Sequence, residues 1–223
     1  MHTGKGQVIE LALRDGFRQA RVACSPALIP APGQFLLSGT ASDSPLPDPV
    51  YYFDSAPEGF LAASVPDRWT PGLELFLRGP LGRGFLMPAS AQKIALLPFT
   101  DRAFRLHSLI LPALNHGASV VMVNSTHHEH LPDAVEVQPF SALDEILSWA
   151  DWVAMEAARE ELPGLREMLG KLKQSPALRN AEILVRTPVP CGGIAECGVC
   201  AFAMKSGWKM ACREGPVFSW AQV

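Results

Sequence analysis

The N-terminal part of the chain, up to about residue 90, alternates short apolar runs with segments rich in Pro, Gly, Asp and Ser. Such runs, bounded by turn-forming residues, are typical of β-strands. The first two runs are placed to pair as a hairpin across Arg14–Phe17. Strands at this spacing predict a small barrel or sandwich. The predicted strands are Gln7–Leu13, Arg18–Cys24, Gln34–Ser38, Val50–Phe53, Phe60–Val65 and Leu73–Leu77.

The pattern changes at Lys93, where continuous apolar runs begin to alternate with apolar residues at helical spacing. Strands that alternate with helices predict a parallel sheet with crossover connections. Pro112 falls inside the first predicted helix, and we expect it to kink that helix. The predicted strands are Ile94–Leu97, Val120–Val123, Trp152–Met155 and Ile183–Val185, and the predicted helices are Phe104–Leu114, Leu143–Trp149 and Leu162–Leu172.

These patterns divide the chain into three parts and predict an α+β multidomain protein. Residues 1–88 are predicted to form an antiparallel β barrel, and residues 89–186 an α/β domain with a parallel sheet. Residues 187–223 form a cysteine-rich tail.

Composition narrows the class of protein. Hydrophobic residues make up 48% of the 223 residues and charged residues 18%, which indicates a globular fold. A net charge of -3 provides no basic field for nucleic acid or for a membrane surface. The apolar runs are too short to cross a bilayer, and the N-terminus does not resemble a signal peptide. We therefore expect a cytoplasmic protein.

Four of the five cysteines fall within 22 residues of the tail, as Cys191-Gly-Gly-Ile-Ala-Glu-Cys197-Gly-Val-Cys200 followed by Cys212. A [2Fe–2S] cluster needs four thiolates, two on each iron. The glycines of the loop allow its backbone to wrap closely and to turn N–H groups toward the sulfurs. Ala201–Ala211 is predicted to form a hairpin that turns at 205–207 and returns Cys212 to the loop. These four cysteines are therefore the predicted cluster ligands.

Two other interpretations of the cysteines remain open. Cys197 and Cys200, two residues apart, suit zinc, although Cys191 and Cys212 do not form the second short-spaced pair that zinc sites usually have. The second interpretation is a set of disulfides, which are expected mainly in an oxidising compartment and not in the cytoplasm. The fifth cysteine, Cys24, is interpreted as a small buried residue at a strand end. His127, His128 and His130 are interpreted as an exposed polar loop, with a metal site as the alternative.

Three segments resemble the electron-transfer subunit of the two-subunit dihydroorotate dehydrogenase, in the ferredoxin-reductase superfamily. They are Pro32-Gly33-Gln34-Phe35, Gly79-Pro80-Leu81-Gly82-Arg83-Gly84-Phe85, and the cysteine tail with its closing 211–218 segment. The order of barrel, α/β domain and tail also matches, so the resemblance covers nearly the whole chain. It implies FAD on the barrel, NAD on the α/β domain, and a cluster that passes electrons to a flavoprotein catalytic subunit.

The chain departs from that family at both nucleotide sites. The flavin strand of the family carries an Arg, whereas the matching stretch around Tyr51 and Tyr52 has none. The sequence therefore leaves FAD binding open; its candidate residues are Tyr51, Tyr52, Gly79, Gly82 and Gly84. The stretch Pro98–Ala103 has no glycine to admit a pyrophosphate, and Met155-Glu156-Ala157-Ala158 replaces a Cys-Gly-Pro turn. We expect NAD binding to be weak or lost.

Together these features predict an electron-transfer protein that forms a hetero-oligomer with a flavoprotein such as dihydroorotate dehydrogenase. No residue acts as an acid or base, because a cofactor must carry the chemistry. We expect the loop Gly192–Val199 to be exposed, with Ile194 and Val199 offering apolar contact to the partner. The alternative is a non-catalytic accessory subunit in which a metal or cluster only staples the tail.

Overall fold

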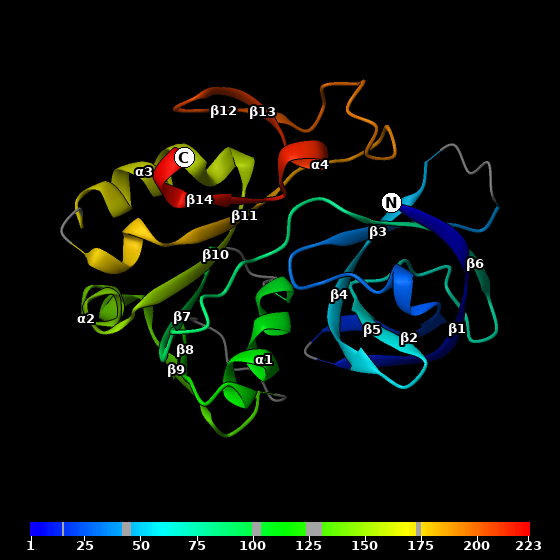
Figure 1. Ribbon diagram of the computed structural model, residues 1–223, viewed down its shortest axis with the longest axis horizontal. Helices are drawn as coiled ribbons and strands as arrows, with labels where there is room; N and C mark the ends of the chain where they lie inside the picture. The colour runs from blue at the N-terminus through cyan, green and yellow to red at the C-terminus, as the bar shows by residue number, and fades with distance from the viewer. Residues whose placement is uncertain (15, 42–45, 100–103, 124–130, 173–174) are drawn as a thin grey trace.

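A computed structural model describes residues 1–14, 16–41, 46–99, 104–123, 131–172 and 175–223. It has two lobes side by side, a β barrel and a parallel sheet flanked by helices, with the C-terminal tail lying along one side of both (Figure 1). The two-lobed arrangement confirms the predicted barrel and α/β region. Among the described residues, no helix is both long enough and apolar enough to cross a membrane.

The barrel is closed, with its strands in the order β1-β2-β5-β4-β3-β6. The first hairpin pairs Arg14 with Phe17, as the sequence predicts. Alternating positions turn inward, so that buried side chains such as Val22, Phe60 and Leu75 fill the barrel interior. The strands are β1 (His2–Arg14), β2 (Phe17–Cys24), β3 (Phe35–Gly39), β4 (Asp48–Ala56), β5 (Gly59–Ala63) and β6 (Glu74–Leu81).

The sheet has the order β14-β11-β10-β7-β8-β9. Neighbouring strands from β11 to β9 pair in parallel, and β14 pairs antiparallel with β11. Two of these strands, β9 and β14, were not predicted from the sequence. The strands are β7 (Lys93–Pro98), β8 (Ser119–Val123), β9 (Val135–Gln138), β10 (Trp152–Ala158), β11 (Glu182–Arg186) and β14 (Val217–Ser219). Because β14 belongs to the tail, the tail is joined to the sheet by backbone pairing.

The helices are short. Pro112 lies in the first turn of α1 (Ile110–Asn115), directly after a 3-10 helix at Arg105–Leu109. A proline is tolerated in a first turn, so the predicted single helix is divided here into two pieces. The other two are α2 (Leu143–Trp149), with the predicted bounds, and α3 (Leu162–Gly170).

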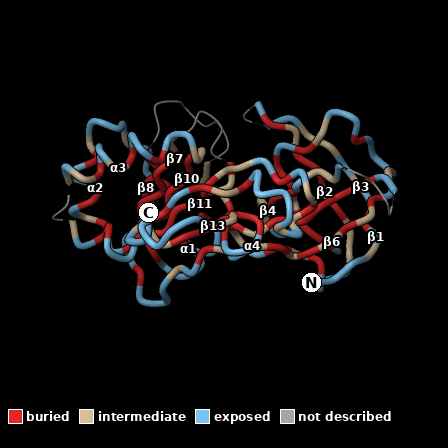
Figure 2. Tube along the Cα trace, turned by 90° about the horizontal axis from the view of Figure 1, so that it is seen from above, coloured by how far each residue is buried: buried red, intermediate tan, exposed pale blue. Residues whose placement is uncertain are grey.

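The barrel and the sheet share one apolar core. Buried residues run through both lobes in Figure 2, and the larger cluster joins barrel residues Phe35, Tyr51 and Leu81 to the strands of the sheet. A smaller cluster fills the barrel interior. Continuous burial across the junction fixes the two lobes against each other.

The segments that carry the family resemblance meet at this junction. A Cβ on Gly33 would lie 2.7 Å from Val217 Cγ2, and a Cβ on Gly82 would lie 2.6 Å from the carbonyl oxygen of Gly215. A Cβ on Gly84 would lie 2.6 Å from the carbonyl oxygen of Pro32. These glycines are needed because barrel, connection and tail approach one another backbone to backbone.

Candidate functional site

The tail brings two cysteines together through a hairpin. After β11 the chain runs through the cysteine loop into β12 (Ala201–Met204) and β13 (Gly207–Met210), then into α4 (Ala211–Glu214). The strands pair in antiparallel register, so Cys212 returns beside Cys200, as predicted. The two Sγ atoms are 3.3 Å apart, and both side chains are buried.

Cys191 and Cys197 form a second pair. The backbone N–H groups of Cys197, Glu196 and Ile194 and the thiol of Cys197 lie near the sulfur of Cys191 and act to lower its pKa. Slight burial raises the pKa of Cys191, but these donors outweigh it and lower the pKa to about 6. The loop therefore stabilises a thiolate at this position.

Cys212 has the opposite environment. Burial, with the neighbouring Cys200 and Cys191 thiols, raises the pKa of Cys212 to about 12. The backbone N–H of Ala195 nevertheless donates to its sulfur. One loop therefore directs backbone donors at both pairs, and Cys191 lies close enough to interact electrostatically with Cys212. Without a cation, two such buried thiols do not ionise together.

The backbone of the cysteine loop adopts left-handed conformations at several residues. Gly192, Gly193 and Gly198 have φ values of 65°, 72° and 69°, in the left-handed region. Ala195 adopts φ 62° without the freedom of glycine. Successive left-handed residues turn consecutive N–H groups to one side, which creates a concave surface for anionic atoms.

The four thiols are grouped two by two. Among the described residues, no group of three or more His, Cys, Asp or Glu side chains is placed so that it could hold a metal ion. Cys24, at the end of β2, is half-buried, and burial raises its pKa. His127, His128 and His130 lie outside the described residues.

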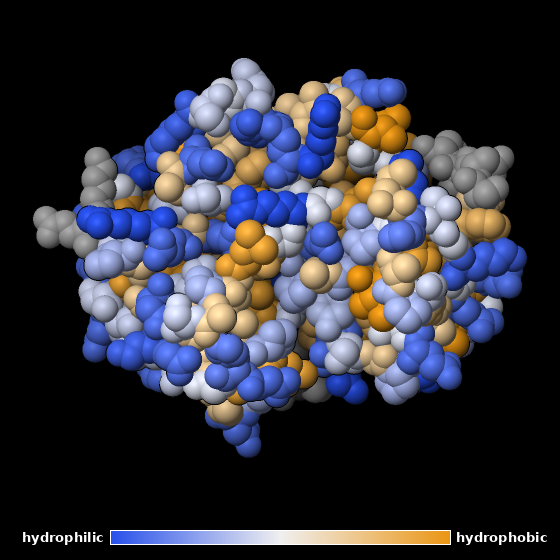
Figure 3. Space-filling view, viewed as in Figure 1, coloured by the Kyte–Doolittle hydropathy of each residue, from blue (hydrophilic) through white to orange (hydrophobic). Residues whose placement is uncertain are grey.

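The cysteine loop lies at the surface. Ile194 is 51% exposed and Val199 is 40% exposed, which confirms the predicted exposure, although Gly192 is buried. Trp208, on the nearby hairpin, is 75% exposed. On the face drawn in Figure 3, apolar residues form separate small groups among hydrophilic ones. Val217 and Phe218, which could have joined an exposed face, are buried in the sheet core instead.

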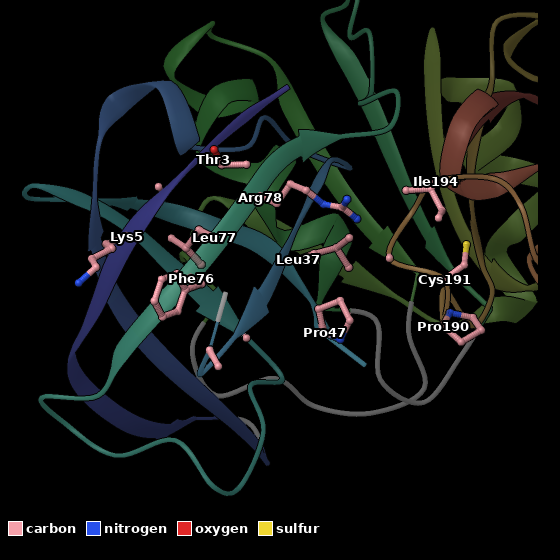
Figure 4. Close-up of a pocket in the computed structure, with 14 residues that line it drawn as sticks. Thr3, Lys5, Leu37, Pro47, Phe76, Leu77, Arg78, Pro190, Cys191 and Ile194 are labelled. Atoms are coloured by element: carbon pink, nitrogen blue, oxygen red, sulfur yellow. The ribbon is translucent and has the colours of Figure 1, made fainter. Parts of the chain in front are cut away.

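A cleft of about 720 Å³ opens beside Cys191. One wall comes from the barrel strands and includes Lys5, Phe76 and Arg78, and the other is the cysteine loop with Ile194. Figure 4 shows Arg78 pointing from β6 toward this loop, whereas Lys5 points away from it. None of the described residues that line the cleft is acidic.

The residues predicted to bind FAD are engaged within the chain. Tyr51 is buried, with the guanidinium carbon of Arg105 4.3 Å from its ring centroid, and Tyr52 stacks on Phe60. Gly79, like the Gly82 and Gly84 described above, has the chain's own atoms where a side chain would begin. The tyrosines therefore face opposite sides, one toward the shared core and one toward the barrel interior.

A buried ion-pair cluster lies at the carboxyl ends of β7 and β10, where the strand order of the sheet reverses. In open α/β sheets this reversal marks the ligand-binding crevice. Here Glu156 is fully buried, and Arg105 Nη1 lies 2.6 Å and Arg186 Nε 3.5 Å from Glu156 Oε1. Burial raises the pKa of Glu156, although both arginines act to lower it. Residues 100–103 of the predicted glycine-free turn lie outside the described residues.

The sequence interpretation missed this cluster and Arg78. One signal for the cluster was visible, because Glu156 interrupts the apolar run Trp152–Ala158 and a buried charge requires a partner. Nothing in the sequence indicated which arginines would meet it. Arg78 carried no signal of its own, since its importance depends on a loop more than a hundred residues away.

Comparisons with known proteins agree with this architecture. No protein-family model matches the sequence, and no curated protein matches it. Among solved structures, an NADH-dependent reduced ferredoxin–NADP oxidoreductase, described for flavin-based electron bifurcation, superposes with a TM-score of 0.71 at 14% identity. That superposition covers 98% of this chain and 89% of the other, so most of the tail is included.

Two further structures support the same class of fold. A ferredoxin reductase of carbazole 1,9a-dioxygenase, in its FAD apo form, superposes with a TM-score of 0.61 at 18% identity, covering 82% of this chain and 66% of the other. A ferredoxin–NADP⁺ reductase from Plasmodium falciparum superposes with a TM-score of 0.58 at 9% identity, covering 82% and 95%. The chain therefore has the ferredoxin-reductase fold, with a barrel and a nucleotide-type sheet.

Proposed function

We propose that this chain is an electron-transfer protein that holds a [2Fe–2S] cluster on Cys191, Cys197, Cys200 and Cys212. In this proposal it delivers single electrons to a flavoprotein partner such as dihydroorotate dehydrogenase. The observation that carries the proposal is the pairing of the four thiols, two by two, under a loop that directs backbone N–H groups at sulfur.

The residues fit a two-iron cluster. Such a cluster needs two thiolates on each iron, and the chain offers one pair at Cys191 and Cys197 and another at Cys200 and Cys212. A single zinc ion needs four ligands around one centre, which suits this grouping less well. When bound, a [2Fe–2S] cluster accepts and releases one electron at a time.

The chain's own atoms have two tasks toward that group. The N–H groups of Ile194, Ala195 and Glu196 offset negative charge on the thiolate sulfurs. The buried positions of Cys200 and Cys212 keep water from one side, while the exposed Cys197 side gives an outside acceptor a short path. No proton transfer by a side chain is required.

The nucleotide sites have less support than the cysteine site. The superposed reductases are described with flavin or FAD and with NADH or NADP, so FAD on the barrel belongs to the proposal as an optional second carrier. Arg105 covers one face of Tyr51, and the Glu156 cluster fills the crevice where a dinucleotide would bind. We therefore propose that NADH is not the electron donor to this chain.

The exposed loop supports a docked partner. One-electron transfer requires that the cluster come close to the acceptor's cofactor, and Ile194 and Val199 present apolar surface beside the ligands. We propose that this loop forms the centre of the interface with the flavoprotein subunit, in a hetero-oligomer.

Visible spectroscopy tests the proposal. Protein purified without air should show iron–sulfur absorption that bleaches on reduction and returns when the flavoprotein subunit of the same organism is added as acceptor. A colourless protein, or one whose reduced spectrum does not change on adding that subunit, would contradict it. Additional flavin bands would show that FAD is retained.

The second candidate function is a non-catalytic accessory subunit in which the metal only staples the tail. The ion pairs that fill the sheet crevice favour it, because they leave no described place there for a nucleotide. The two candidates differ in one result. A staple would leave the protein unable to exchange electrons with the flavoprotein, although tail and fold remain intact.

A further inference from the structure

Arg78 is the cation closest to the cysteine loop along the wall of the cleft. Its Nη2 atom lies 2.7 Å from the point that a Cβ on Gly192 would occupy. Gly192 follows Cys191 directly and is held at φ 65°, a conformation that strains any residue with a side chain. The guanidinium therefore rests against the backbone of the loop itself (Figure 4).

Within the described residues, the guanidinium of Arg78 has no hydrogen-bond or ion-pair partner, and the described lining of the cleft includes no Asp or Glu. By contrast, Arg83, farther along the same segment, is paired with the buried Glu182 at 2.8 Å. A half-buried cation without a partner is costly unless it faces an anionic group.

We infer that Arg78 tunes the reduction potential of the cluster, an inference that rests on the proposed function. Each electron added to the cluster makes it more negative, and a nearby fixed positive charge favours the reduced state. Net charge and hydrogen bonding around the sulfurs are among the factors that set such potentials. Arg78 acts from outside the ligand set, through its position beside Gly192.

The other residues that line the cleft bear on the expected effect of Arg78. Leu37 and Leu77 line the cleft together with Arg78, whose Nη2 atom lies at the backbone of Gly192. Lys5, the other cation of the cleft, lies 3.5 Å from the carboxylate of Glu74 and points away from the loop, so it adds little. Arg78 is therefore the single residue of the described lining expected to act on the cluster.

The test is a spectroelectrochemical titration of the full-length protein, purified without air, in three variants. Arg78→Gln should lower the midpoint potential while iron and sulfide content stay unchanged. Arg78→Lys keeps the charge and should restore most of the potential. Arg21→Gln is the matched control, because it removes the same charge from β2, a strand that does not line the cleft.

The possible outcomes distinguish failure of the inference about Arg78 from failure of the proposed function. A lower potential in Arg78→Gln alone supports the inference. Equal midpoint potentials in Arg78→Gln and the wild type would overturn the inference and leave the proposed function standing. A shift in Arg21→Gln as large as that in Arg78→Gln would do the same, because it would indicate only an effect of net charge. A wild-type protein without iron and sulfide would overturn both.

Discussion

The cysteine loop and the crevice of the sheet are the two places where this fold offers room for a redox group, and they are built in opposite ways. The loop directs backbone N–H groups at sulfur atoms, holds three glycines and an alanine in left-handed conformations, and is largely exposed. The crevice is filled by Glu156, with Arg105 and Arg186 against it. One place has backbone donors directed at sulfur, and the other has its buried charges paired with one another.

The contrast illustrates that the packing of this fold does not depend on either place. Packing between barrel, sheet and tail depends on apolar contacts and on the close approaches at Gly33, Gly82 and Gly84, none of which needs a nucleotide. Function depends on particular groups placed on that framework. The framework is present in the described part of the chain, and we propose that the cysteine loop provides the groups that a cofactor needs.

The largest effect is expected at the cysteine ligands. Cys200→Ser replaces a buried thiolate by a hydroxyl that binds iron poorly, so the purified protein should lose nearly all of its iron and visible absorption. Cys24→Ser is the matched control, because Cys24 is on the barrel, and it should keep both. Metal analysis with absorption spectra gives the answer. Retention of full iron content by Cys200→Ser would remove Cys200 from the ligand set.

A large effect of another kind is expected in the crevice. Glu156→Gln leaves two arginines beside an uncharged amide in a buried place, which should cost about 3 kcal/mol of unfolding free energy. Urea unfolding measures this cost. Glu160→Gln, at an exposed ion pair with Arg159, is the control and should change stability by less than about 1 kcal/mol. Equal costs for the two variants would show that the buried cluster does not hold the crevice closed.

The sequence predicted the framework better than it predicted the sites. Strong apolar runs with clear turns placed the barrel strands and most of the sheet, because burial on a fixed period leaves a visible pattern. The strand Val135–Gln138 was missed because two of its residues are exposed at the sheet edge, and Val217–Ser219 because it has only three residues. The return of Cys212 to the cysteine loop was predicted from the hairpin turn, whereas the grouping of the thiols in two pairs was not predicted. The Arg105 and Arg78 contacts join distant segments, so no local pattern could reveal them.

A moderate effect on electron delivery is expected from the exposed part of the loop. Ile194→Asp places a charge where we propose apolar contact with the flavoprotein, and it should slow reduction of that partner roughly tenfold. The cluster spectrum should not change, since the side chain of Ile194 is exposed and only its backbone faces sulfur. Val137→Asp, an exposed apolar residue on β9, is the control. Stopped-flow rates equal to wild type in Ile194→Asp would argue against docking at this loop.

The smallest effect is expected from NADH. Because the crevice is occupied by the Glu156 cluster, titration of the protein with NADH should give no heat of binding and no bleaching of the cluster. Isothermal calorimetry and anaerobic absorption spectra measure the two quantities. Saturable binding, or reduction of the cluster by NADH in this chain alone, would show that the crevice opens and would remove the contrast with the cysteine loop.

The central claim is that the paired cysteines hold a two-iron cluster, and metal and sulfide analysis of the anaerobically purified protein tests it most directly. The account predicts about two iron atoms and two acid-labile sulfides per chain, with little zinc. About one zinc per chain, with neither iron nor labile sulfide, would contradict the electron-transfer function and favour the tail staple.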